Sequence, residues 1–111
     1  MEISAERRDG GVTVVRPAGR LDLLSAAELK RLLVEEVGAG QSRLVVDLEG
    51  VAFIDSSGLG ALIGGLKAAR TAGGNLRLAR AGEQALTILE LTTLDRVLRP
   101  YPTVEDALAA A

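Results

Sequence analysis

Two adjacent serines follow an aspartate in the segment Asp55-Ser56-Ser57-Gly58, directly after an apolar run that ends at Ile54. A serine hydroxyl can attack a carbonyl group or accept a phosphoryl group, and Asp and Ser side chains also cap the start of a helix. Nucleophilic catalysis needs a base, but the chain contains no His. The segment also lacks the Gly-x-Ser-x-Gly pattern of serine hydrolases. We therefore expect no enzyme here, and two interpretations remain: capping residues alone, or a modifiable serine at a helix entrance.

The residues after the serines give a helix with two unlike faces. At 100° per residue, Leu59, Leu62, Ile63 and Leu66 share one apolar face, which predicts burial. The opposite face carries almost no side-chain bulk and collects Ser57, Gly60, Ala61, Gly64 and Ala68. Each glycine inside a helix costs about 1 kcal/mol relative to alanine. Such a face could admit the backbone of another protein beside Ser56, or a neighbouring helix of the same domain.

A second aspartate, Asp22, follows Gly19-Arg20-Leu21 where a predicted strand gives way to a helix. If this strand lies beside the strand that ends at Ile54, both carboxylates lie at the same end of the sheet. Asp22 is alternatively a simple turn residue.

Composition excludes several function classes. The chain has 111 residues, 48% of them hydrophobic, which is typical of one folded domain spanning residues 1–111. Without Cys or His, we expect no disulfide, no metal site and no cofactor. Aromatic residues make up 2%, so the core must be built from Leu, Val, Ile and Ala. With few aromatic residues and a net charge of −2, we expect no nucleic-acid partner. No apolar run reaches about 18 residues and the N-terminus has no apolar leader, so we expect no membrane insertion and a cytoplasmic protein.

The elements that position these residues alternate between strands and helices. Residues 3–8 and 12–18 flank Gly10-Gly11 and predict a hairpin, with Pro17 near a strand end or an edge. Ser25 and Glu28 fit a capping box that opens the first helix, which ends at Gly38 and whose apolar stripe is Leu29, Leu32, Leu33 and Val37. The next predicted strand is residues 43–48, which residues 51–54 continue towards a turn, and further strands are predicted at 76–79 and 97–98. The remaining predicted helices are residues 57–72, one capped by Thr103, and residues 83–91 with Ala85, Leu86 and Leu89 facing inward.

This order predicts an α/β fold with a mostly parallel sheet of 4–5 strands, an N-terminal hairpin strand and about four helices. In such sheets, binding sites gather where strands lead into helices.

The site segment resembles the signature of the STAS domain, and more narrowly that of bacterial anti-sigma factor antagonists. Three stretches carry the resemblance over nearly the whole chain: Val46-Asp47-Leu48 through Asp55-Ser56-Ser57-Gly58-Leu59-Gly60, Gly19-Arg20-Leu21-Asp22 with Ser25, Ala26 and Leu29, and Gly73-Gly74-Asn75-Leu76. Ser25 stands where Thr is frequent in the family, and it should cap a helix equally well.

The resemblance implies partner switching in transcription regulation. The unphosphorylated antagonist would bind an anti-sigma factor that is also a serine kinase, phosphorylation would release it, and a serine phosphatase would reset it. The resemblance implies that Ser56 is the phosphoacceptor, and that Asp22, Asp55, Ser57 and Gly58 contact the partner or shape the site. Gly60, Ala61 and Gly64 join the partner-binding set as members of the bare face.

Two other functions stay open. A STAS subunit of a lipid-transport or signalling assembly would need no phosphorylation. A nucleotide-binding or anion-binding module would hold its ligand at Ser56-Ser57-Gly58, although the chain lacks a Gly-x-x-x-x-Gly-Lys-Ser/Thr loop.

Overall fold

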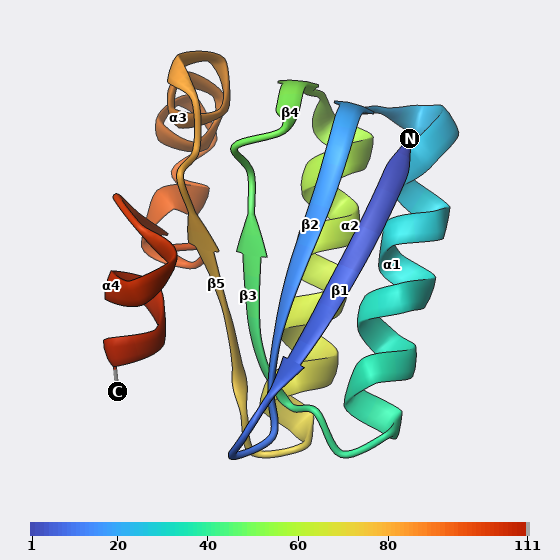
Figure 1. The fold of residues 1–111 in the computed structure, drawn as a ribbon. Helices are drawn as coiled ribbons and strands as arrows, with labels where there is room; N and C mark the ends of the chain where they lie inside the picture. Colours follow the sequence, from blue (N-terminus) through green and yellow to red (C-terminus); the bar gives the residue numbers. More distant parts are fainter. Residues whose placement is uncertain (111) are drawn as a thin grey trace.

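A computed structural model describes residues 1–110 and shows one six-stranded sheet with helices on both faces (Figure 1). The strand order is β1-β2-β3-β5-β6, and β4 pairs with β2. The strands are β1 (Glu2–Arg8), β2 (Val12–Leu21), β3 (Arg43–Asp47), β4 (Val51–Ile54), β5 (Asn75–Ala79) and β6 (Pro100–Tyr101). The predicted α/β class and N-terminal hairpin are confirmed. The sheet has six strands because residues 51–54 form a strand of their own, β4, which pairs with β2.

Helices α1 (Leu23–Gly38) and α2 (Ser56–Thr71) lie side by side on one face of the sheet (Figure 1). On the other face, α4 (Val104–Ala109) packs against β3 and β5. Helix α3 (Glu83–Leu91) contacts β4 and the 3₁₀ helix η1 (Leu94–Arg96). The candidate site lies at the edge where β2 leads into α1 and β4 leads into α2.

Strand β2 pairs with β1 along one side and with two parallel strands, β3 and then β4, along the other. Its first half pairs with β3 through Val15, and its end pairs with β4 from Gly19 to Leu21. Pro17 lies between these two pairings, where the missing N–H costs no ladder bond. The predicted strand-end position is wrong, since Pro17 is buried inside β2.

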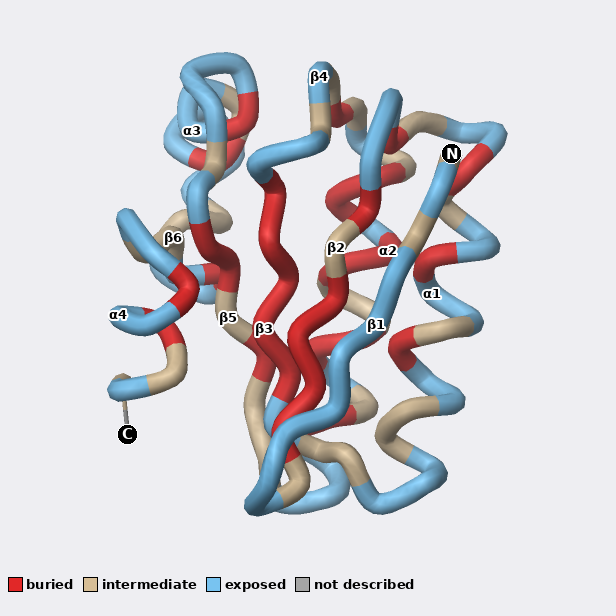
Figure 2. Tube along the Cα trace, viewed as in Figure 1, coloured by how far each residue is buried: buried red, intermediate tan, exposed pale blue. Residues whose placement is uncertain are grey.

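The core lies between the sheet and the α1–α2 layer (Figure 2). Leu29 and Leu33 of the predicted α1 stripe are buried, as are Leu59, Leu62 and Leu66 of α2. A smaller cluster under α4 includes Val14, Val45, Ala79, Val104 and Ala107. The core is therefore almost wholly aliphatic, as the composition predicted.

The start of the first helix and the place of the last strand differ from the sequence prediction, and β2 extends to Leu21 where the prediction ended at residue 18. Helix α1 begins at Leu23 with Asp22 as its N-cap, not at Ser25. No strand forms at residues 97–98, because the Val97 and Leu98 N–H groups donate to the Leu94 carbonyl in the turn of η1. The last strand is Pro100–Tyr101. Leu86 was expected to face inward on α3 and is instead exposed, whereas Ala85 and Leu89 are buried.

Candidate functional site

Asp22 and Asp55 occupy equivalent places at the ends of two adjacent parallel strands. Leu21 of β2 pairs with Ile54 of β4, and each aspartate is the next residue and the N-cap of the following helix. The Asp55 N–H donates to the Leu21 carbonyl at 3.2 Å, which joins the two helix entrances. The prediction that the two carboxylates lie at the same end of the sheet is confirmed.

Ser56 is the first residue of α2 and its side chain is exposed. Asp55 Oδ1 accepts a hydrogen bond from the Gly58 N–H at 3.0 Å. The Ser56 and Ser57 N–H groups precede the helical ladder and have no intrahelical acceptor. Ser57 is half-buried, so the hydroxyl that a partner enzyme can approach freely is that of Ser56.

Gly58 fits a site that excludes every larger residue. A Cβ at this position would collide with the Leu21 carbonyl and would lie 2.8 Å from Leu21 Cγ. The absent side chain lets the first turn of α2 rest directly on the end of β2. Gly58 therefore shapes the site from below, and because it is buried it is not a surface contact.

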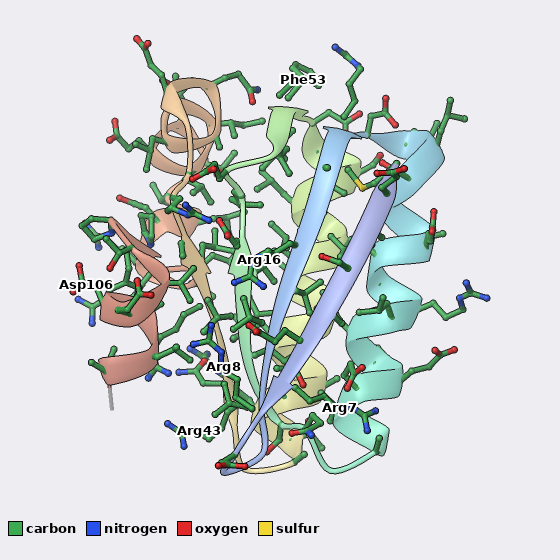
Figure 3. The ribbon with its side chains drawn as sticks, in the orientation of Figure 1. Arg7, Arg8, Arg16, Arg43, Phe53 and Asp106 are labelled. Atoms are coloured by element: carbon green, nitrogen blue, oxygen red, sulfur yellow. The ribbon has the colours of Figure 1, made fainter. Side chains whose placement is uncertain are left out.

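Asp22 is engaged twice within the protein. Its Oδ1 accepts from the Leu24 N–H at 3.1 Å, and its Oδ2 lies 3.6 Å from Arg20 Nε. The Arg20 guanidinium also lies 4.3 Å from the centroid of the Phe53 ring, a cation–π contact. Phe53 marks this end of the sheet in Figure 3. Asp22 is thus a helix cap and an ion-pair partner, more than a simple turn residue.

The bare face of α2 is only partly exposed. Gly60 is exposed, and a Cβ there would meet nothing within 4 Å. Ala61 is 3% exposed, so the expectation that a partner touches it is wrong, because the residue is buried within the domain. Gly64 lies under Lys30, whose Cε would be 2.8 Å from an added Cβ, and Gly65 packs on Leu33 in the same way. Two of the glycines thus admit the neighbouring helix, while Gly60 faces solvent.

Two leucines at the same end were not singled out from the sequence. Leu23 and Leu24, the first residues of α1, are 74% and 93% exposed. The sequence could have indicated them, because they follow the N-cap Asp22 and precede the buried stripe that starts at Leu29. They were overlooked because the helix was predicted to start at Ser25, which left both leucines outside it.

Residues 1–110 hold no group of three His, Cys, Asp or Glu side chains that could bind a metal ion. At the α2 entrance, the Asp55 carboxylate takes the Gly58 N–H, so an anion there would have the Ser56 and Ser57 N–H groups as donors and would lie beside a carboxylate. In the same part of the chain, no helix is long and apolar enough to cross a bilayer.

The STAS domain family model matches residues 3–107. The chain belongs to the STAS domain family. An anti-sigma factor antagonist homologue from Thermotoga neapolitana is 30% identical over 98 residues, 87% of each chain. The anti-sigma-B factor antagonist of Bacillus subtilis is 32% identical over 84 residues, 76% of each chain. A crystal structure of an anti-sigma factor antagonist from Thermotoga maritima superimposes with a TM-score of 0.88 at 28% identity, covering 96% of this chain and 91% of that one.

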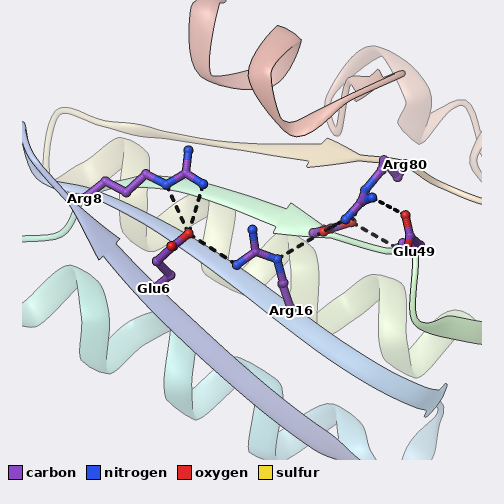
Figure 4. Close-up of polar contacts among 6 residues, drawn as sticks. Glu6, Arg8, Arg16, Glu49 and Arg80 are labelled. Carbon is purple, nitrogen blue, oxygen red and sulfur yellow. Dashed lines mark hydrogen bonds and ion pairs between the residues drawn. The ribbon is translucent and has the colours of Figure 1, made fainter.

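A chain of charges crosses the sheet face of this STAS domain opposite α1 and α2 (Figure 4). Asp47, 2% exposed, accepts from Arg80 at 3.1 and 2.5 Å and from the Glu49 N–H at 3.1 Å. Arg16 Nε lies 3.3 Å from Asp47 and its Nη1 lies 3.4 Å from Glu6. Burial raises the pKa of Asp47, but the Arg80 and Glu49 hydrogen bonds and the charges of Arg80 and Arg16 outweigh it, so the pKa lies below its ordinary value. This network anchors the turn between β3 and β4, which leads to the site.

Proposed function

We propose that this STAS domain is an anti-sigma factor antagonist in the cytoplasm, a binding module without catalytic activity of its own. Unphosphorylated, it binds an anti-sigma factor that is also a serine kinase, and phosphorylation of Ser56 releases it. A serine phosphatase restores the hydroxyl. The observation that carries the proposal is the exposed Ser56 at the α2 entrance, beside two acidic caps. The names of the related antagonists support the same function.

The proposed contact surface is the end of the domain where α1 and α2 begin. It comprises Asp22, Asp55, Ser57 and Gly60, together with the exposed side chains of Leu23 and Leu24. Exposed leucines beside polar caps are the composition of an interface core with a polar rim. Gly58 and Gly64 support this surface from inside the domain, and Ala61 is removed from it.

Phosphorylation would act through charge and not through refolding. A phosphoserine carries about −1.5 to −2 charges, and on Ser56 it would stand next to the Asp55 carboxylate. The Gly58 N–H is already bonded to Asp55, so this donor cannot neutralise the phosphate. A partner closing over the site would have to desolvate both anions, which costs several kcal/mol. A cost of about 1.4 kcal/mol already lowers affinity tenfold.

The proposal can be tested by mixing three variants with kinase-like anti-sigma factors from the same genome and following binding and phosphorylation. Ser56→Ala should bind in the presence of ATP and stay unmodified, Ser56→Asp should bind at least about tenfold more weakly, and Ser57→Ala should still gain one phosphate. Intact mass and calorimetry are the measurements. Tight binding by Ser56→Asp would refute the electrostatic release. A phosphate on Ser57 in the Ser56→Ala variant would refute the acceptor assignment.

The same measurements distinguish the antagonist from the STAS subunit alternative. A subunit of a lipid-transport or signalling assembly would remain unphosphorylated with every kinase offered and would show no ATP-dependent release. Unmodified wild-type protein after incubation with all kinase-like anti-sigma factors of the genome would therefore favour that alternative over the antagonist.

A further inference from the structure

Gln84, the second residue of α3, binds both backbone groups of one residue of β4. Its Oε1 accepts from the Ile54 N–H at 2.9 Å, and its Nε2 donates to the Ile54 carbonyl at 2.8 Å. Only a side chain with an acceptor and a donor side by side can satisfy both groups at once. The carboxamide therefore takes the place of a neighbouring strand residue.

Ile54 needs this partner because β4 is paired on one edge only. Strand β4 pairs with β2, and the Ile54 N–H and carbonyl point towards α3, away from β2. The next amide, that of Asp55, turns back to the Leu21 carbonyl. The peptide groups on both sides of Ile54 are thus held by Gln84 immediately before the cap of α2.

Since this position lies two residues before Ser56, we propose that Gln84 is a positioning residue for the phosphoacceptor. It fixes the last residue of β4, and through it the direction in which Asp55 and Ser56 leave the strand. We call the two hydrogen bonds between Gln84 and Ile54 the clamp. Its effect on phosphorylation rests on the proposed function, but the clamp itself can be measured without a kinase. It also makes α3, which packs against β4, a support of the acceptor.

Replacing Gln84 by Glu gives a variant that can be switched by pH. The carboxylate can accept from the Ile54 N–H only by bringing its second oxygen against the Ile54 carbonyl, and this repulsion between two acceptors weakens the bond to the N–H as well. The protonated carboxyl group has the shape and the donor–acceptor pair of the amide. The clamp is therefore broken at neutral pH and restored as the pH falls through the pKa of the introduced carboxyl. Glu83 and Asp55 place two further carboxyl groups next to Gln84 and Ile54 in the sequence, so each curve is compared with that of the wild type.

The test measures amide hydrogen exchange, corrected for intrinsic rates, in the wild type, Gln84→Glu and Gln84→Met. Thr87→Glu is the matched control, because it adds one carboxylate on the exposed side of the same helix. At neutral pH we expect about tenfold lower protection of Ile54 in Gln84→Glu and Gln84→Met, with shifted Ser56 and Ser57 amide signals. Acid should restore the wild-type values in Gln84→Glu only, and Thr87→Glu should match the wild type throughout.

The second part of the test measures phosphorylation kinetics with a kinase that phosphorylates the wild type. We expect kcat for Ser56 phosphorylation to fall about tenfold in Gln84→Met, with a smaller change in KM, since the acceptor is presented less often in a reactive geometry. Unchanged exchange and signals in Gln84→Glu and Gln84→Met at neutral pH would overturn the clamp. Altered exchange with unchanged kcat would overturn its positioning role. A wild type that no kinase phosphorylates would overturn the proposed function instead, leaving the exchange result standing.

Discussion

The position of Ser56 depends on three neighbouring residues with separate tasks. Asp55 caps the helix, Gly58 allows the close approach of β2, and Gln84 holds the preceding strand residue. The cap was predictable because Asp-Ser after an apolar run is a local signal. The family resemblance pointed to Gly58 without indicating its contact with Leu21. Gln84 was not predictable, because its contact joins residues 30 positions apart and a glutamine at a helix start has no distinctive pattern.

Gly58 and Gly60 lie two residues apart and should respond oppositely to the same substitution. In Gly58→Ala the new methyl group collides with Leu21, so we expect a loss of about 1–3 kcal/mol in the free energy of unfolding. In Gly60→Ala the methyl group meets nothing, and the better helix propensity should add about 0.5–1 kcal/mol.

Urea denaturation of both glycine variants measures the difference. Because Gly60 belongs to the proposed contact surface, Gly60→Ala should also bind the kinase partner more weakly despite its higher stability. Equal stability of the two variants would contradict the packing of α2 on β2.

Helix starts and stops show what local sequence patterns predict at the scale of an element. The ends of α1 and α2 fall within one residue of the predicted positions, since glycines follow both helices. The start of α1 was misplaced because Asp22 and Ser25 are both good caps. Both take part in the capping box of the structure. Asp22 is the N-cap, and Oγ of Ser25, the third helical residue, accepts a hydrogen bond from the Asp22 N–H.

Ser25→Ala should weaken the joint between β2 and α1. Ser25 Oγ accepts from the Asp22 N–H at 3.0 Å and donates to the Arg20 carbonyl at 2.7 Å, and the residue is 6% exposed. Losing both bonds in a buried place should cost about 1–2 kcal/mol of unfolding free energy. Ser4→Ala on the exposed face of β1 is the control and should change it by less than about 0.5 kcal/mol. Indistinguishable urea midpoints for the two variants would contradict the capping arrangement.

At the scale of the whole molecule, the order of strands and helices predicted the α/β class, and the aliphatic composition predicted the core. The pairing of β2 with both β3 and β4 was not predictable, because it depends on the bend of the chain after Asp47. The charge network on the open sheet face was also missed. Its members come from β1, β2, β3 and the end of β5, and no local pattern connects them.

Acid should remove the contribution of Asp47 to stability. Its folded pKa lies below the unfolded value, so the stabilisation is complete above about pH 4 and is lost as the pH falls through the lower, folded pKa. Asp47→Asn should lose about 1–3 kcal/mol of unfolding free energy at pH 7. Its deficit relative to the wild type should shrink in acid. Urea midpoints of both proteins across the acid range are the measurement, and a deficit that is the same at every pH would contradict the ionic role.

Within residues 1–110, the Ser56 hydroxyl takes part in no hydrogen bond of the fold, so altering it breaks nothing inside the domain. A phosphate on Ser56 would therefore change only the surface around it, and only a molecule that touches this surface could sense or remove it. Under the proposed function, the kinase-like anti-sigma factor and the phosphatase would need the same surface, so only one of them could be bound at a time.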